Sequence, residues 1–254
     1  SREMPGAAVL AATAALRCGA GKLVVATAAS VAGPMGFALP EARVIALPET
    51  PGGGLAMQGL EQLESSLRDA AAVLVGPGLM DAEATQRFVL ALLALAKTVP
   101  VVLDALAMDV LALRPRFEQP VLLTPHAGEM AHLSGASKQD VLADPHAAAL
   151  AGAARWNAVV AVKGPMTVIA APDGQCWRHE GGNNGLATSG SGDTLAGAIA
   201  GLAARGATLA QACAWGVAVH ALAGEHLAMD LGPVGFLARE LPGSMLAALS
   251  VLQA

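Results

Sequence analysis

The segment with the clearest chemistry is residues 183–197, where small residues lead into a predicted helix. Within it, residues 190–193 place one carboxylate among glycines and a serine. The first amides of a helix lack internal acceptors and lie at the positive end of its dipole, so they could hold a phosphate in transfer. Asp193 would then be a general base that takes a proton from an attacking hydroxyl. The alternative is that Ser191 or Asp193 only caps the helix.

A second candidate segment ends one predicted strand and opens a predicted hairpin. Its residues are Lys163, Gly164, Pro165, Met166 and Thr167. A lysine at the end of a strand could reach a phosphate, and the threonine adds a hydroxyl. The alternative is an ordinary turn in which the lysine is solvated.

A third segment, residues 124–130, follows the predicted strand at residues 121–123. In open α/β sheets, ligands bind beyond the carboxyl ends of the strands. This rule places His126 and Glu129 where they can touch a ligand. The alternative is that Thr124 and Glu129 only start a helix and that His126 is incidental.

Weaker signals follow two other predicted strands. The turn at residues 76–78 could bring backbone close to a ligand, while Asp104 could orient a substrate or a metal ion, or only cap the next helix. Residues 19–22 lack the hydroxyl side chain and the first glycine of a phosphate-binding loop, and no GxGxxG motif opens a strand–helix unit. The six histidines are scattered singly, without metal-ligand spacing.

The composition is apolar and poor in charge. Of 254 residues, 54% are hydrophobic and 14% charged, and the mean hydropathy is +0.54. The longest charge-free stretches, residues 23–40 and 206–224, contain Gly and Pro or polar side chains, which argues against a membrane protein. A net charge of −5 argues against a nucleic-acid partner. Three cysteines without CxxC spacing favour reduced thiols and a cytoplasmic location.

The elements that must position these segments alternate along the chain. Strands are predicted at residues 23–26, 43–47, 72–76, 99–103, 121–123, 159–162 and 167–170, and helices at residues 6–17, 57–69, 82–97, 138–156, 194–205, 209–228 and 235–252. Continuously apolar strands are typical of a sheet covered on both faces. The alternation therefore predicts an α/β fold with a parallel sheet. A turn at residues 172–174 predicts that the last strand forms a hairpin with residues 176–179.

Taken jointly, the motifs resemble the ADP/ATP-dependent NAD(P)H-hydrate dehydratases of the ribokinase-like superfamily. The matching segments are residues 5–8, 17–21, 76–79, 104–105, 124–130, 163–164 and 187–193. The resemblance implies a three-layer α/β/α sandwich with a mainly parallel central sheet, formed as one domain over residues 1–254. Because the family opens with a strand before the segment that matches residues 1–3, we expect that strand to be missing from the sheet.

The resemblance also implies an activity and roles for individual residues. Hydrated NADH or NADPH would be phosphorylated at its C6 hydroxyl and would then lose phosphate, with Mg²⁺ as cofactor and ADP or ATP as co-substrate. Asp193 would be the catalytic base. The nucleotide contacts would be Lys163, Gly164, Pro165, Met166, Thr167, Gly190, Ser191 and Gly192. The contacts to the hydrated dinucleotide would be Ala7, Gly78, His126 and Asp193.

Two other classes of protein compete with this interpretation. A small-molecule kinase of the same superfamily, such as one for hydroxyethylthiazole, would share residues 190–193 but leave the phosphate on its product. A catalytically inactive nucleotide-binding protein would have no need of Asp193. We further expect a homo-oligomer, with a tetramer as the candidate assembly, because the shortage of charge suggests buried helix faces. An NAD(P)H-hydrate epimerase is the expected functional partner.

Overall fold

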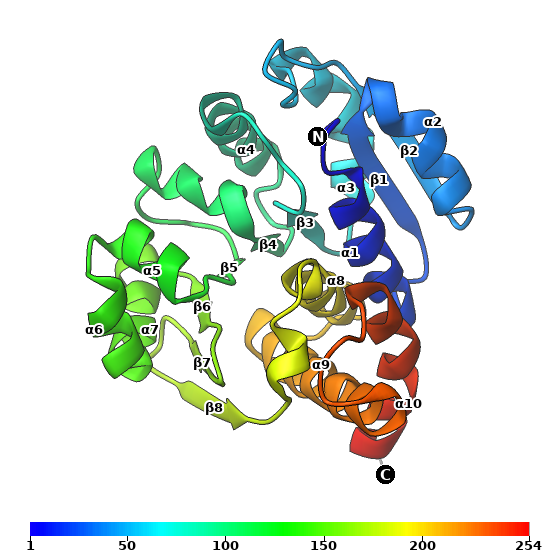
Figure 1. Ribbon diagram of the computed structural model, residues 1–254. Coiled ribbons are helices and arrows are strands. Elements are labelled where there is room, and N and C mark those ends of the chain that lie inside the picture. The colour runs from blue at the N-terminus through cyan, green and yellow to red at the C-terminus, as the bar shows by residue number, and fades with distance from the viewer. Residues whose placement is uncertain (254) are drawn as a thin grey trace.

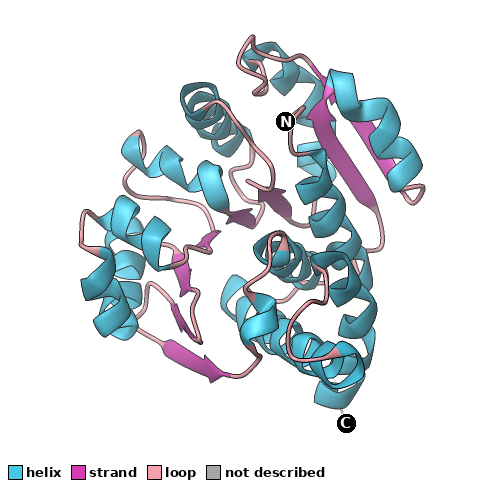
Figure 2. Ribbon diagram, in the orientation of Figure 1, coloured by secondary structure: helices cyan, strands magenta, loops and turns pink. Residues whose placement is uncertain are grey.

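The computed structural model describes residues 1–253, and its centre is a six-stranded sheet in the order β3-β4-β5-β6-β7-β8 (Figures 1 and 2). The strands are β3 (Val73–Val75), β4 (Val101–Leu103), β5 (Val121–Leu123), β6 (Val159–Val162), β7 (Met166–Ala170) and β8 (Cys176–Glu180). Strands β3 to β6 run parallel, and β7 and β8 form the predicted antiparallel hairpin. The α/β fold with a mainly parallel sheet is thus confirmed.

Alternate side chains of the central strands belong to two separate apolar cores, one on each face of the sheet. In β4, Val101 and Leu103 belong to one apolar cluster and Val102 to the other, and Leu122 and Leu123 of β5 divide in the same way. Successive side chains of a strand point to opposite faces, so an uninterrupted apolar run is what a sheet covered on both sides requires.

The helices form two layers, one on each face of the sheet. One face of the sheet is covered by α4 (Ala82–Leu95), η2 (Ala105–Ala112), α5 (Ala127–Ser134), α6 (Lys138–Ala143) and α7 (Pro145–Trp156). The other face is covered by α8 (Ser191–Ala204), α9 (Leu209–Leu231) and α10 (Leu241–Gln253), with η3 (Asn184–Leu186) and η4 (Ala238–Glu240) in the connections. None of the described helices is long and apolar enough to cross a membrane.

Strands β1 (Leu23–Ala28) and β2 (Ala42–Leu47) form a parallel pair of their own. The prediction of a single sheet is therefore wrong for these two strands. Helix α1 (Pro5–Arg17) packs against α8 and also places Ala12 in an apolar cluster with Val25 and Met35. The pair thus joins the rest of the fold through side-chain packing. Figure 1 shows the two strands beside α1 and α2.

Several predicted helices differ in their boundaries. The helix expected at residues 138–156 is two helices, because Asp144 caps α7 and Pro145 begins it. The helix expected at residues 57–69 begins as the 3-10 segment η1 (Met57–Leu63) and continues as α3 (Glu64–Asp69). Helix α2 (Ala29–Ala38) was not expected, because it contains Pro34 and two glycines. Burial of its Met35 shows that tertiary packing outweighs a low helix propensity here.

The closest helix contact in the fold joins α1 to α8. A Cβ atom at Gly197 would overlap the Ala11 carbonyl, and one at Gly201 would overlap the Ala15 carbonyl. The two backbones therefore touch where glycine removes the side chain. This contact fixes the position of α8, which carries Asp193.

We expect Gly197→Ala to lower the free energy of unfolding by about 1–3 kcal/mol, because the added methyl group must push α1 away from α8. The matched control is Gly243→Ala in α10, where a Cβ atom would meet nothing within 4 Å. Alanine is the better helix former, so the control should be neutral or slightly stabilising. Denaturant unfolding of both variants checks this, and equal stabilities would contradict the packing analysis.

Candidate active site

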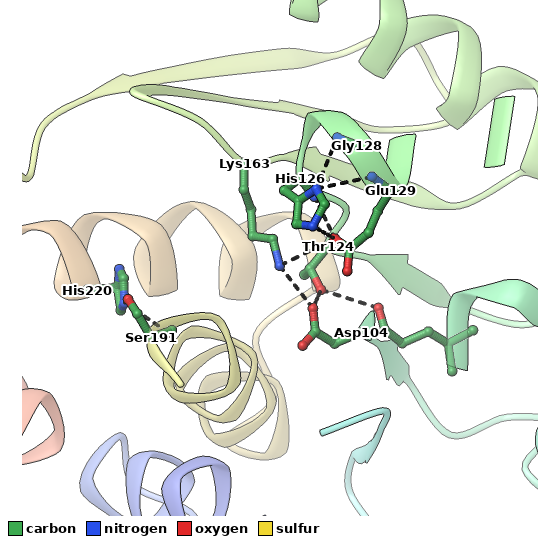
Figure 3. Close-up of polar contacts among 9 residues, drawn as sticks. Asp104, Thr124, His126, Gly128, Glu129, Lys163, Ser191 and His220 are labelled. Carbon is green, nitrogen blue, oxygen red and sulfur yellow. Dashed lines mark hydrogen bonds and ion pairs between the residues drawn. The ribbon is translucent and has the colours of Figure 1, made fainter. Parts of the chain in front are cut away.

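Side chains from three successive parallel strands meet at one edge of the central sheet (Figure 3). Asp104 directly follows β4, Thr124 directly follows β5 and Lys163 directly follows β6. The Lys163 amide also donates to the Pro125 carbonyl (2.8 Å), which joins the turns after β5 and β6. The strand-end rule thus gathers residues that are distant in sequence.

The Asp104 carboxylate is the centre of this group. Its Oδ1 accepts hydrogen bonds from Thr124 Oγ1 (2.6 Å) and from Lys163 Nζ (3.1 Å). The Lys163 ammonium also lies 4.0 Å from Glu129 Oε2, and its side chain is only 18% exposed. The solvated-lysine alternative is therefore wrong. Asp104 likewise does not cap η2 with its side chain, so the capping alternative is wrong for this residue too.

His126 is the capping residue of α5. Its Nδ1 accepts hydrogen bonds from the amides of Gly128 (3.0 Å) and Glu129 (3.1 Å), and Glu129 Oε2 accepts one from the His126 amide (2.8 Å). A helix does start here, but the cap is His126, whereas Thr124 binds Asp104. Because Nδ1 accepts these bonds, a neutral His126 carries its proton on Nε2 and presents a donor from a 61% exposed ring.

The first turn of α8 is free of side-chain caps. Gly190 occupies the N-cap position with φ +88°, and neither Ser191 nor Asp193 caps the helix. The capping alternative is therefore wrong for both residues. Gly192 faces the charged group, because a Cβ atom there would lie 3.5 Å from Lys163 Nζ. Uncapped amides beside an ammonium form a site that suits a phosphate.

Asp193 stands on this first turn with a carboxylate that accepts no hydrogen bond from the described residues. Its pKa is raised to about 6, chiefly by burial and secondly by the negative charge of Asp104, while Lys163 acts in the opposite direction. A carboxylate with a pKa close to neutrality is a stronger base than an exposed one. The geometry and the pKa both suit proton abstraction.

Two of the predicted substrate contacts, Ala7 and Gly78, lie next to each other. Gly78 has φ +69°, and a Cβ atom there would overlap the Met4 carbonyl and approach the Ala7 Cβ. Gly76 in the same turn packs against the Asp104 backbone. The turn after β3 therefore connects Ala7 and Gly78 to the group around Asp104.

The remaining predicted nucleotide residues form the turn between β6 and β7. Gly164 and Pro165 make the turn itself, and Met166 and Thr167 begin β7. Thr167 is 9% exposed and pairs with His179 of β8. The structure thus places Lys163 beside α8 and Thr167 four residues further along the same segment.

Sequence reasoning missed one residue at this site. His220 of α9 contacts Ser191 through Nε2, which lies 2.9 Å from Ser191 Oγ and 3.1 Å from the Ser191 carbonyl oxygen (Figure 3). The only signal in the sequence is a histidine within a long apolar helix that also contains His226. That signal does not say which residue the histidine contacts.

Comparison with known proteins gives a consistent result. The family model described as NAD(P)H-hydrate dehydratase matches residues 1–244. An ADP-dependent (S)-NAD(P)H-hydrate dehydratase of Xanthomonas campestris pv. campestris is 48% identical over 246 residues, which cover 95% of this chain and 83% of that protein. A bifunctional NAD(P)H-hydrate repair enzyme of Moorella thermoacetica is 40% identical, but the match covers only 46% of its length.

Solved structures agree with the sequence relatives. The ADP/ATP-dependent NAD(P)H-hydrate dehydratase of Bacillus subtilis, co-crystallised with ATP and Mg²⁺, has a TM-score of 0.83 at 34% identity, covering 99% of this chain and 86% of that one. A hydroxyethylthiazole kinase of Pyrococcus horikoshii has a TM-score of 0.63 at 17% identity, covering 93% of this chain and 92% of that one, and so shares the fold alone. A ribokinase-like structural neighbour from Enterococcus faecalis supports the same fold class. This chain belongs to the NAD(P)H-hydrate dehydratase family.

Proposed function

We propose that this protein is an ADP-dependent (S)-NAD(P)H-hydrate dehydratase. The observation that carries the proposal is the Asp193 carboxylate, which accepts no hydrogen bond within residues 1–253 and lies in an uncapped helix turn that faces Lys163. A base beside a phosphate-binding turn is what phosphorylation of a hydroxyl requires. The names of the relatives support the identity of the substrate.

The reaction proceeds in two stages. Asp193 takes the proton of the C6 hydroxyl while that oxygen attacks the terminal phosphorus of ADP, and the bond to AMP breaks. The new phosphate ester is a good leaving group. The ring nitrogen supplies an electron pair as the C6–O bond breaks, and loss of a proton from C5 then restores the dihydronicotinamide ring. The products are NAD(P)H, AMP and phosphate.

Lys163 and the first amides of α8 stabilise the phosphoryl group in transfer. The amides of Gly190, Gly192 and Asp193 have no acceptor among the described residues and so can donate to phosphate oxygens, whereas the Ser191 amide donates to the Thr188 carbonyl (3.2 Å). Lys163 would release part of its interaction with Asp104 and Glu129 to meet a phosphate that carries more charge than either carboxylate. His126 offers an Nε2 donor to the hydrated dinucleotide from the same edge of the sheet.

A magnesium ion fits this site as a companion of the nucleotide. The described residues contain no group of three or more side chains that could hold a metal ion by themselves. Mg²⁺ in such enzymes is held chiefly by phosphate and water, with one or two carboxylates. Asp104 and Glu129, which flank Lys163, are the carboxylates available for that role. The bound ion would neutralise phosphate charge.

We expect Asp193→Asn to reduce turnover by about 10²–10⁴-fold, because the amide cannot accept the hydroxyl proton. Binding of ADP should stay nearly unchanged, since the amides and Lys163 remain. Conversion of hydrated NADH to NADH, followed by absorbance, measures turnover, and calorimetry measures nucleotide binding. The control is Asp140→Asn, which changes a carboxylate in the first turn of α6, outside the site, and should leave turnover intact.

The same assay separates the competing functions. A small-molecule kinase would leave the hydrate unconsumed and would phosphorylate a vitamin precursor instead. Wild-type turnover by Asp193→Asn would remove Asp193 from the mechanism. Parallel reactions with ADP and ATP determine the preferred nucleotide, for which we expect ADP.

The pH dependence should follow the protonation of Asp193. Its pKa of about 6 predicts that kcat/KM falls as the pH drops below that value, because the protonated acid cannot act as a base. Asp104→Asn removes a negative charge that raises this pKa, so the acid limb should move to lower pH. The control Asp109→Asn, in a residue paired with His132, should leave the limb in place. A limb that stays fixed or moves upward in Asp104→Asn would contradict this electrostatic account.

A further inference from the structure

Helix α9 holds the loop that leads into the first turn of α8. The Gly182 amide donates to Glu225 Oε1 (2.7 Å), and Asn183 Nδ2 donates to the Gly224 carbonyl (2.8 Å). One turn earlier on the helix, His220 contacts Ser191. Residues 220 and 224 are four positions apart and therefore lie on the same face of α9, and Glu225 follows directly. Helix α9 therefore holds both ends of the segment from Gly182 to Ser191.

His220 contacts two oxygen atoms of Ser191. Its Nε2 lies 3.1 Å from the carbonyl oxygen, which can only accept, and 2.9 Å from Oγ, which can donate or accept. Both residues are buried: His220 is 8% exposed and Ser191 is 4% exposed. Burial lowers the pKa of His220 to about 4, which leaves the ring neutral at neutral pH. With its proton on Nε2, the neutral ring donates to the Ser191 carbonyl, and Ser191 Oγ lies beside the same proton.

The contact to the Ser191 carbonyl also affects the backbone amide of Gly192. The Ser191 carbonyl and the Gly192 amide belong to one planar peptide unit, with the C=O and N–H bonds pointing in opposite directions. A contact that holds the oxygen from the α9 side therefore also restrains the direction of the Gly192 N–H. Gly192 lies next to Lys163 Nζ, on the side of the turn where the phosphate would bind.

We propose that His220 is a positioning residue that aims the Gly192 amide, and with it the first turn of α8, at the phosphoryl group in transfer. This inference rests on the proposed function, since it assumes that the turn receives a phosphate. His220 itself does not touch the substrates: it acts through the Ser191–Gly192 peptide. The alternative is that His220 only fills space and satisfies its own polar atom in the α8–α9 interface.

The test compares three variants of the full chain. His220→Leu removes the donor, and His220→Gln keeps an amide N–H near the position of Nε2. Val217→Ala is the matched control, because Val217 is a buried residue of the same helix without a polar contact to α8. Calorimetry with ADP and Mg²⁺ gives nucleotide affinity, initial rates give kcat and the pH profile, and thermal unfolding gives stability.

We expect His220→Leu to lower kcat by about 10–100-fold, since a misdirected amide stabilises the phosphoryl group less well. ADP affinity should fall by a smaller factor. The acid limb of the pH profile should stay in place, because Asp193 is still present. His220→Gln should recover most of the lost kcat, and Val217→Ala should lower the unfolding temperature while keeping kcat.

Two results would overturn the proposal. One is a His220→Leu protein that is less stable but has wild-type kcat and ADP affinity below its unfolding temperature. The other is a His220→Gln protein as impaired as His220→Leu although equally well folded. Failure of the proposed function looks different, because the wild-type protein would then not consume the hydrate, while the calorimetric comparison of ADP binding would still report on the Gly192 amide.

Discussion

The ion pair between Lys163 and Asp104 is the interaction on which the site depends. It joins the ends of β4 and β6, and Thr124 ties the intervening β5 to the same carboxylate. A nearly buried ion pair gains little stability, because desolvation of both charges opposes their attraction. Its value lies in placement: it holds an ammonium beside the first turn of α8 and keeps a negative charge near Asp193. Lys163 therefore prepares the site for an anion, whereas Asp104 raises the pKa of Asp193, the proposed base.

Close backbone packing explains the composition of the chain. Helix α8 is buried along almost its whole length and meets α1 at Gly197 and Gly201, where any side chain would collide with a carbonyl. Helix α9 similarly approaches α8 at Gly216. Such contacts select glycine and alanine and leave few surface positions for charges. The low charge content therefore follows in part from helices that pack at short range around a sheet covered on both faces.

The sequence predicted the parts of the site that depend on strand ends, but not the parts that depend on tertiary contacts. Apolar runs located β4, β5 and β6, so Asp104, His126 and Lys163 could be placed at one edge of the sheet. The bond from Lys163 to Asp104 spans 59 positions and could not be read from local patterns. The residue that His220 contacts could not be predicted for the same reason, since the contact depends on how α9 packs against α8. Helix α2 and the separate β1–β2 pair were missed because packing overrides the signals of Pro34 and of strand alternation.

The glycine contact between α1 and α8 also bears on how two substrates meet. Helix α1 carries Ala7, the proposed contact of the dinucleotide, whereas α8 carries Asp193 and the amides proposed to receive the nucleotide. Two helices whose backbones touch cannot slide or separate without losing that contact, so the walls of the two binding regions behave as one rigid body. The distance between the acceptor hydroxyl and the donor phosphate is then largely set by the protein before either ligand arrives. Part of the entropic cost of bringing the two reactants together is therefore incurred when the protein folds, before either ligand binds.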